Sequence, residues 1–351
     1  MPNSLAIRSF EALEQEPLLP RITGGVALPR PLRVGIISNP ESGQNKRHGL
    51  HKRIRDVLQS HPQVEHFDTG TVEGMKAAAR DLVLSGTEIL VVNGGDGTTQ
   101  AVLTAMFGTP VDRLPVLAVL AGGTTNCTAH NVGFGKRPLE AVQRLLTAAA
   151  HGSLPGTVET RAVVRADIAN DTQYGMMFAA GAVYHGILFY REHIESRGLR
   201  GEMAVGLAIA AFAWKILSGN GGTLFPPFRA DVLIDGKAIP RETYLAIMTS
   251  TISRQVLGFS PYWGSGPGPL RHTSLRYQPK HLARSIVPIL RGKAGAYLRP
   301  EFGYRSVNTN EVSLSFDSGF TLDGELFPPA DGQMQVTLST RQRAYFLRDA
   351  R

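Results

Sequence analysis

The sequence predicts an α/β protein in which a doubly wound parallel sheet is followed by a largely antiparallel β-sandwich. Between residues 32 and 150, short apolar runs alternate with helical patterns, which is typical of an open parallel sheet with helices on both faces. After Pro155 the pattern changes to short β-rich runs separated by turn signals such as Asp235-Gly236. A chain of 351 residues is long enough for two such domains.

The first half of the chain contains three apolar strand patterns and one further candidate strand at residues 64–69, each followed by a helical pattern. The expected strands are residues 32–38, 64–69, 88–92 and 116–120. The expected helices are residues 49–59, 72–85, 99–107 and 139–150. In an open parallel sheet, ligands bind outside the carboxyl ends of the strands. Functional residues are therefore expected in the turns that follow these strands.

The β-rich runs of the second half predict a second domain that begins near Gly156. They are residues 161–168, 176–180, 230–234, 244–251 and 311–316, and a helical interval at about residues 186–218 interrupts them. The chain is therefore expected to consist of a poorly ordered lead-in at residues 1–30, an α/β domain at 31–155, a β-sandwich domain at 156–335 and a C-terminal segment at 336–351 that returns to the first domain.

The composition is that of an ordinary globular protein, with 42% hydrophobic and 19% charged residues. The lone cysteine, Cys127, excludes an internal disulfide and argues against a thiolate zinc site. The most apolar run, residues 203–217, is shorter than the roughly 20 residues that a membrane-spanning helix needs. Because the first residues also show no secretory signal, a soluble, cytoplasmic protein is expected.

Basic residues outnumber acidic ones by 37 to 29, which favours anionic partners. Residues 261–300 contain no aspartate or glutamate, and their bases include Arg271, Arg276, Arg284, Arg291 and Lys293. These five form either a solvated basic face or a surface that makes peripheral contact with an anionic membrane. Aromatic residues do not alternate with the bases, so nucleic acid is not an expected partner.

The strongest local signal is Gly94-Gly95-Asp96-Gly97-Thr98, directly after an apolar strand pattern. Glycines there let the backbone approach a phosphate group closely, and the following helix presents its N-terminus to the anion. A carboxylate beside phosphate is useful only when it meets a metal ion or a proton, so Asp96 is a candidate Mg²⁺ ligand or general base. The alternative is a plain tight turn in which Asp96 caps the helix.

Two further turns of small residues follow neighbouring strands: Asn39-Pro40-Glu41-Ser42-Gly43 and Gly122-Gly123-Thr124-Thr125-Asn126. Taken singly, each is equally well explained as a loop without a binding role. Three such turns at three strand ends, however, converge on one crevice of a parallel sheet, and that crevice suits a nucleotide. Neither Gly-x-x-x-x-Gly-Lys-Ser/Thr nor Gly-x-Gly-x-x-Gly, the phosphate-binding motifs of other folds, occurs in the sequence.

A late carboxylate motif, Asp323-Gly324-Glu325, lies in the second predicted domain. An Asp-Gly pair most often forms a hairpin turn. A catalytic role requires this turn to reach the crevice of the first domain, where the carboxylate of Glu325 can orient or deprotonate an attacking hydroxyl group.

In this order, the motifs resemble those of the diacylglycerol kinase catalytic-domain family, which includes bacterial lipid kinases, sphingosine kinases and ceramide kinases, with NAD kinases as more distant relatives. The matching residues are the turns at 39–43, 94–98 and 123–126 and the late Leu322-Asp323-Gly324-Glu325, and the resemblance covers roughly residues 32–347. It implies an ATP-binding α/β domain, a β-sandwich domain for the acceptor, and an active site between the two domains.

The resemblance also implies an activity and its residues. The ATP γ-phosphoryl group, with Mg²⁺ as cofactor, passes to a hydroxyl of a membrane lipid such as diacylglycerol, phosphatidylglycerol or a sphingoid base. Glu325 is the implied proton acceptor, and Asp96 is the implied ligand of the catalytic Mg²⁺ at a position that some relatives use as the base. The implied ATP-binding residues are Asn39, Pro40, Glu41, Ser42, Gly43, Thr69, Gly94, Gly95, Asp96, Gly97, Thr98, Gly123, Thr124 and Asn126. A homodimer is compatible with the sequence.

The chain departs from the family pattern at several positions. Cys127 follows Asn126 where relatives often have aspartate, and Gly181-Ala182-Val183-Tyr184 only partly matches the family's substrate-side element. Residues 263–275 contain no carboxylate, so the structural Mg²⁺ site of bacterial members is not expected. Two alternatives therefore stay open: a soluble-metabolite kinase such as an NAD kinase, and a nucleotide- or lipid-binding relative without turnover.

Overall fold

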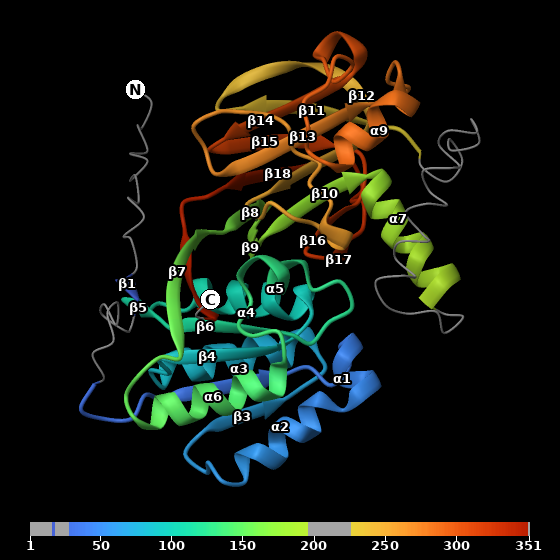
Figure 1. The fold of residues 1–351 in the computed structure, drawn as a ribbon. Helices are drawn as coiled ribbons and strands as arrows, with labels where there is room; N and C mark the ends of the chain where they lie inside the picture. The colour runs from blue at the N-terminus through green and yellow to red at the C-terminus, as the bar shows by residue number, and fades with distance from the viewer. Residues whose placement is uncertain (1–15, 18–27, 196–225, 350–351) are drawn as a thin grey trace, which may run out of the picture.

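The computed structural model describes residues 16–17, 28–195 and 226–349, which form two sheets, the first with helices around it (Figure 1). The expected lead-in at residues 1–30 lies largely outside the described residues, as does the apolar run at residues 203–217. Of the lead-in, β1 (Glu16–Pro17) is described and pairs with β5 (Arg113–Leu114). In the described part of the chain, no helix combines the length and the apolar character needed to cross a membrane.

The first sheet has six strands in the order β3-β2-β4-β6-β19-β7. The parallel strands are β3 (Glu65–Asp68), β2 (Val34–Ser38), β4 (Ile89–Gly94), β6 (Val116–Ala121) and β19 (Arg343–Asp349). At the edge, β7 (Gly156–Ala162) pairs antiparallel with β19. The last strand of the chain thus joins the sheet that the first half of the chain builds.

Helices cover both faces of this sheet, as Figure 1 shows. One face carries α2 (Leu50–Leu58) and α6 (Pro138–Ala150), and the other carries α3 (Val72–Leu84), α4 (Asp96–Gly108) and α5 (Cys127–Val132). Alternate residues of β4 enter the two cores, because successive side chains of a strand point to opposite faces. A short α1 (Gly43–His48) ends at Gly49, whose φ of 59° favours glycine. The predicted doubly wound parallel sheet is confirmed.

The second sheet folds over on itself because the long strand β12 (Lys237–Ser250) belongs to two layers. Its residues 246–250 pair with β10 (Met177–Gly181), and its residues 237–244 pair with β11 (Phe228–Ile234). The first layer also contains β13 (Leu270–Arg276), β14 (Tyr304–Thr309), β16 (Phe320–Leu322) and β17 (Glu325–Phe327). The second also contains β15 (Glu311–Phe316), β18 (Met334–Ser339), β8 (Val164–Ile168) and β9 (Asp171–Gly175).

An apolar core fills the space between these layers. Phe178 of the first layer contacts Phe316 of the second edge to face, with ring centroids 6.3 Å apart. Aromatic pairs at such distances add to the stability that burial of their area provides. All pairings within this sheet are antiparallel, which confirms the predicted antiparallel second part of the fold.

The structure differs from the sequence expectation at several places. Residues 161–168, expected as one strand, are divided between β7 and β8, which belong to different sheets. Helix α9 (Leu282–Leu290) was not expected, because Pro288 interrupts its helical pattern. Of the helical interval at 186–218, the structure describes α7 (Ala182–Tyr190) and a π-helical turn (Arg191–Glu195), and the remainder lies outside the described residues. Short 3₁₀ turns lie at Val256–Gly258 and Pro300–Phe302.

Candidate active site

The turns after β2, β4 and β6 contact one another at the carboxyl edge of the first sheet. The side-chain amide of Asn39 donates to Thr98 Oγ1 at 3.0 Å. Ser42 Oγ donates to the carbonyl oxygen of Gly122 at 2.9 Å, and the N–H of Gly122 donates to the carbonyl oxygen of Gly94 at 3.1 Å. Neighbouring parallel strands end at the same edge, which is why the turns meet. The structure therefore brings the three predicted turns together.

Glycine is required where these turns touch. A Cβ atom added at Gly123 would lie 2.4 Å from Gly95 Cα, and one added at Gly43 would lie 2.4 Å from Thr124 Oγ1. A Cβ added at Gly97 would instead meet no atom within 4 Å. Residues 95–97 are partly exposed, so the outer side of this loop is open. The first N–H groups of α4 have no partner within the helix, and an anion on this open side can accept hydrogen bonds from them.

Asp96 links the turn after β4 to the start of α5. Its carboxylate accepts hydrogen bonds from Thr125 Oγ1 at 2.8 Å, from Cys127 N at 3.1 Å and from Thr128 N at 2.7 Å. Asp96 thus caps a helix, but the capped helix is α5 and not α4, whose first turn it occupies. The side chain remains half-buried, so it borders the open side of the loop while it holds two turns in register.

The Asp323-Gly324-Glu325 turn of the second sheet lies close to Asp96. The buried Asp323 carboxylate accepts hydrogen bonds from Met176 N at 2.7 Å and Met177 N at 2.9 Å. Burial raises the pKa of Asp323 well above its ordinary value, and the charge of Asp96 raises this pKa further. Next to this turn, Gln100 of α4 donates to Gln173 Oε1 of β9 at 3.0 Å, and Tyr174 N donates to Thr104 Oγ1 of α4 at 3.0 Å. The strand that leads to Met176 therefore packs against the helix that begins at Asp96, as a catalytic role for the turn requires.

Glu325 begins β17 and is half-buried beside this turn. The guanidinium group of Arg191, in the turn after α7, donates to the carbonyl oxygen of Gly324 at 2.8 Å. The two positive φ angles of the turn, 50° at Asp323 and 87° at Gly324, let the chain reverse within two residues. Asp323 and Glu325 therefore differ in their surroundings: Asp323 is fixed and buried, whereas Glu325 is partly accessible.

Other predicted ATP-binding residues shape the turns. The Asn126 side chain accepts from Gly123 N at 2.7 Å and donates to the Gly123 carbonyl oxygen at 3.0 Å. Glu41 is exposed and pairs with Lys46 at 2.7 Å. Thr69 N donates to the carbonyl oxygen of Ser38 at 3.0 Å, which places Thr69 one strand away at the same sheet edge. The side-chain groups of Asn126 and Glu41 are thus already engaged with the protein.

Three residues near this edge received no individual role from sequence. Thr125 was noted only as part of a small-residue turn, Asp323 only as part of a hairpin motif, and Arg191 not at all. Asp-Gly was a signal for the turn, but no local pattern reports that Arg191 meets Gly324, 133 residues away in the chain.

The surroundings of Asp96 fit a Mg²⁺ ion that takes most of its ligands from a nucleotide. Thr128, whose N–H donates to Asp96, has a buried Oγ1 without a hydrogen-bond partner among the described residues. Mg²⁺ is usually bound by one or two carboxylates together with substrate phosphates and water. Across residues 28–195 and 226–349, no group of three or more His, Cys, Asp and Glu side chains is placed to hold a metal ion by itself. Asp96 would hold Mg²⁺ here only together with bound phosphates.

The bases predicted to face a membrane are spread over the second sheet. Arg284, Arg291 and Lys293 are exposed on α9 and in the turn that follows it. Arg276 is exposed at the end of β13, whereas Arg271 is half-buried at the start of this strand. Five residues of a strand span roughly 17 Å, so Arg271 and Arg276 lie far apart.

The pKa of Asp323 predicts a pH dependence of stability. The folded protein retains a proton that an unfolded aspartate, with an ordinary pKa of 3.8, has released. The free energy of unfolding should therefore fall as the pH rises from 3.8 to the raised pKa, because the unfolded chain binds fewer protons than the folded chain over this interval. Asp323→Asn should remove this fall in denaturant titrations carried out at a series of pH values above 3.8. Equal slopes in both proteins would contradict this assignment.

Comparisons with known proteins agree with this geometry. Residues 33–154 match the model of the diacylglycerol kinase catalytic domain. A diacylglycerol kinase structure from Bacillus anthracis str. Sterne is similar with a TM-score of 0.56 and 14% identity, over 90% of this chain and 96% of that chain. A second protein of that organism, provisionally assigned as a diacylglycerol kinase, is similar with a TM-score of 0.61 and 16% identity, over 92% and 97% of the two chains. At such identities the likeness shows the fold.

A third structure, an NAD kinase from Archaeoglobus fulgidus in complex with ATP, is similar with a TM-score of 0.46 and 11% identity, over 91% of this chain and 94% of that chain, and supports no functional inference. Comparison with curated proteins finds no match. The family resemblance stated from sequence is confirmed by the domain match and agrees with the two-sheet fold. Residues 33–154 thus match the diacylglycerol kinase catalytic domain, and this match supports a kinase of that family.

Proposed function

We propose that this protein transfers the γ-phosphoryl group of ATP to a hydroxyl group of a membrane lipid. The observation that carries the proposal is the contact among three turns of the first sheet, beside which Asp323-Gly324-Glu325 is held through Met176 and the neighbouring strand β9. The open glycine loop of the first sheet supplies donors for phosphate oxygens. The second sheet supplies a partly accessible carboxylate, Glu325, directly after the Asp323-Gly324 turn.

The proposed reaction is an in-line displacement. The acceptor hydroxyl oxygen forms a bond to the γ-phosphorus, the bond from this phosphorus to the bridging oxygen breaks, and ADP leaves with the electron pair. Glu325 accepts the hydroxyl proton as the new bond forms. Backbone N–H groups of residues 95–98 hold the phosphate oxygens, and Asp96 keeps this loop in place against α5. Bound Mg²⁺ supplies positive charge that neutralises the phosphates.

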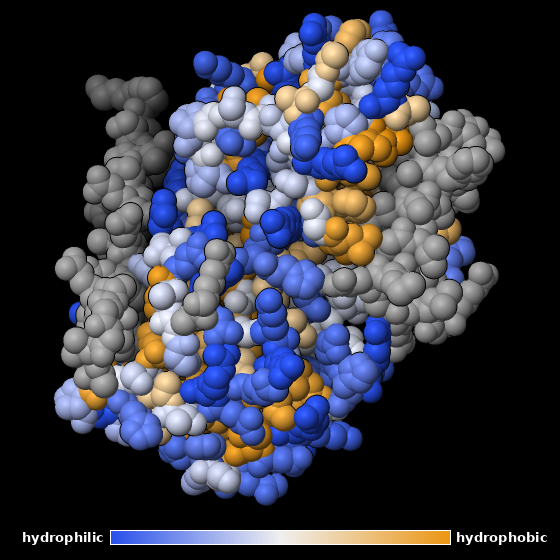
Figure 2. Space-filling model, viewed as in Figure 1, coloured by the Kyte–Doolittle hydropathy of each residue, from blue (hydrophilic) through white to orange (hydrophobic). Residues whose placement is uncertain are grey.

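A lipid acceptor is supported by the surface around α9. This helix buries Ile289 against the sheet but exposes 54% of Val287, with Leu282, Ile286 and Leu290 half-buried. Figure 2 shows hydrophobic residues gathered at the upper right of the second sheet, where α9 lies in Figure 1, with hydrophilic residues beside them. An apolar surface with bases at its border suits contact with an anionic membrane. Peripheral contact would bring the kinase to an acceptor that stays in the bilayer.

A panel assay tests this proposal. Transfer of labelled phosphate from ATP is measured with vesicles that contain diacylglycerol, phosphatidylglycerol, sphingosine or ceramide, and separately with NAD. We expect labelled product with at least one lipid and none with NAD, and removal of Mg²⁺ by chelation should abolish transfer. Transfer to NAD alone would identify a soluble-metabolite kinase. ATP binding without any transfer would identify a nucleotide-binding relative that lacks turnover.

The α9 surface predicts salt-sensitive vesicle binding. Changing Arg284, Arg291 and Lys293 together to glutamate should greatly reduce sedimentation with anionic vesicles, because each base near such a surface contributes about 1 kcal/mol. Salt should weaken wild-type binding likewise, since screening lengths fall to roughly 8 Å at physiological ionic strength.

A matched control reverses three exposed bases of the first domain, Lys52, Arg53 and Arg80. This variant has the same net charge as the α9 variant. If both variants sediment equally at low salt, net charge and not the α9 surface governs binding.

A further inference from the structure

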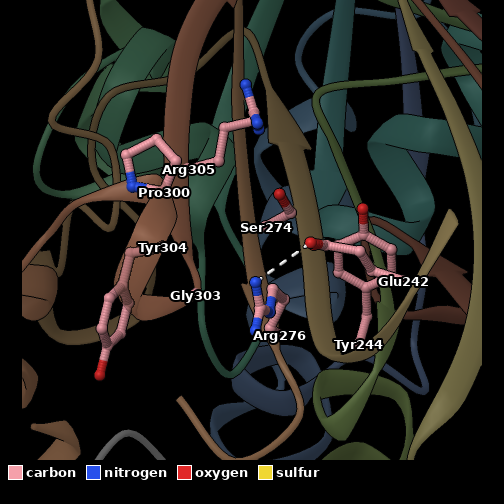
Figure 3. A pocket seen from close by; sticks show the side chains of 8 residues that line it. All are labelled: Glu242, Tyr244, Ser274, Arg276, Pro300, Gly303, Tyr304 and Arg305. Atoms are coloured by element: carbon pink, nitrogen blue, oxygen red, sulfur yellow. Dashed lines mark hydrogen bonds and ion pairs between the residues drawn. The ribbon is translucent and has the colours of Figure 1, made fainter. Parts of the chain in front are cut away.

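A polar pocket lies in the β-sandwich, away from the four turns. It has about 230 Å³ of empty space, part of it open to solvent, and is lined by Glu242, Tyr244, Ser274, Arg276 and Arg305 among others. Figure 3 shows Ser274 between the two arginines, with Glu242 and Tyr244 beside Arg276. The pocket sits at the end of β13 that is remote from Ser250, whose side chain bonds the backbone near Asp323. Five to six residues of strand, roughly 17–20 Å, separate the two places.

Strand register explains why these side chains share one pocket. Ser274 of β13 lies opposite Arg305 of β14, and Arg276 follows Ser274 by two positions on the same face of the strand. Tyr244 of β12 lies opposite Arg276 on the other side of β13. Three neighbouring strands thus present two guanidinium groups and two hydroxyl groups to one hollow, at spacings of roughly 5 to 8 Å.

The two hydroxyl groups lack partners in the protein. Tyr244 is 2% exposed and Ser274 is 4% exposed, and within the described part of the chain neither hydroxyl makes a hydrogen bond. Neither oxygen is a buried atom without a partner, so both are reached by solvent in this open pocket, where a ligand can replace water. Burial raises the pKa of Tyr244 to about 12, so its hydroxyl keeps its proton and remains a donor at neutral pH. Both hydroxyl groups can therefore donate to an acceptor that enters the pocket.

The charge of the pocket is positive. Arg276 pairs with Glu242, its Nη1 lying 3.2 Å from Oε1. Arg305 is half-buried and makes no ion pair with any described residue. Arginine is the side chain best shaped to bind two phosphate oxygens at once, and it retains its charge at all physiological pH values. A partly desolvated guanidinium beside two unpaired hydroxyl donors is an environment that favours an anion.

We propose that this pocket binds a phosphate group, held by Arg305, Arg276, Ser274 and Tyr244. The phosphate belongs either to a soluble phosphate ester or to a phospholipid headgroup, since both present the same oxygens. The segment that contains α9 begins after Arg276 and ends before Gly303, and both of these residues line the pocket. The pocket therefore lies next to the α9 surface. Binding here does not depend on the kinase reaction.

The first experiment measures binding of inorganic phosphate and of glycerol 3-phosphate by calorimetry, without ATP. Arg305→Gln should weaken binding about tenfold or more, as expected for loss of a charge-assisted hydrogen bond. Glu242→Gln should instead strengthen binding by roughly threefold, because it removes a negative charge and frees Arg276. Arg305→Lys, which keeps the charge but loses the planar fork, should be intermediate. Arg53→Gln, an exposed residue of α2, is the control for net charge and should bind as wild type does.

The second experiment separates the two sources of phosphate. Sedimentation is measured with vesicles that contain phosphatidic acid and with phosphatidylcholine vesicles, whose choline groups shield the phosphate. If Arg305→Gln loses binding to phosphatidic acid and Arg53→Gln keeps it, the pocket binds a phospholipid headgroup. If the two variants sediment equally and calorimetry detects phosphate binding, the pocket binds a soluble phosphate ester. The proposal is overturned if the wild type binds neither of the two phosphate compounds and does not bind phosphatidic acid. It is also overturned if Arg305→Gln and Arg53→Gln bind every probe equally, or if Glu242→Gln binds phosphate more weakly than the wild type does.

Discussion

Asp96→Asn is expected to lower kcat by about 10²-fold or more while the chain remains folded. The wild-type carboxylate accepts three hydrogen bonds, from Thr125 Oγ1 and from the first N–H groups of α5. An amide can accept with its oxygen only, and its NH₂ group faces a donor, so the turns after β4 and β6 lose their register. The variant also loses the charge that a bound Mg²⁺ would meet. Steady-state kinetics with a saturating lipid acceptor measures the effect.

The stability of this variant separates catalysis from folding. Loss of a helix cap costs about 1 kcal/mol, so Asp96→Asn should show a small decrease in melting temperature and an unchanged circular dichroism spectrum. Glu140→Gln is a suitable control, because Glu140 also occupies the first turn of a helix, α6, and is exposed beside Arg137. The control should retain full turnover. Unchanged turnover in purified Asp96→Asn would show that Asp96 serves neither the metal ion nor the proton.

Glu325→Gln is expected to abolish phosphoryl transfer and to leave ATP affinity unchanged. Glu325 starts β17 in the second sheet, whereas the open glycine loop belongs to the first. A glutamine of the same shape cannot accept the hydroxyl proton, and loss of general-base catalysis typically costs 10² to about 10⁴ in rate. Calorimetry with ATP and a transfer assay on the same preparation separate the two properties.

The control for this variant is Asp331→Asn, which removes an exposed carboxylate shortly after β17. It should bind ATP and transfer phosphate as the wild type does. If ATP affinity collapses together with turnover in Glu325→Gln, the residue contributes to the nucleotide site or to the fold.

The parallel sheet could be predicted because its signals are local. Residues 89–92 of the run at 88–92 are all apolar, as expected for a strand that is covered on both faces, and they lie in β4 (Ile89–Gly94) with alternate residues in two cores. Gly94 and Gly95, which follow this run, indicated the turn at the end of the strand. The same reasoning could not separate β7 from β8, because residues 156–168 are β-forming throughout and only their partners, β19 and β18, assign them to different sheets.

Helix α9 escaped prediction for a related reason. Its nine residues include Pro288, which weakens any helical pattern, and its stability depends on packing Ile289 against Leu245 and Leu275 of the sheet. The bases between residues 261 and 300 were likewise interpreted from sequence as a single surface. In the fold, Arg271 is half-buried, Arg276 lines the sandwich pocket and pairs with Glu242, and Arg284 lies on α9 with its guanidinium 5.6 Å from the centre of the Tyr297 ring.

The sequence by itself determined the turn residues of the candidate site, because the conformation of Gly94, Gly95 and Gly97 and the approach of a helix N-terminus are properties of a few adjacent residues. It also determined the order of the four motifs, and hence the family resemblance. Only the tertiary structure decided what these motifs contact. Asp96 and Asp323 are far apart in the chain, as are Arg191 and Gly324, and no local sequence pattern extends that far. Whether the members of each pair come close therefore depends on how the chain folds in three dimensions and not on the residues that flank them.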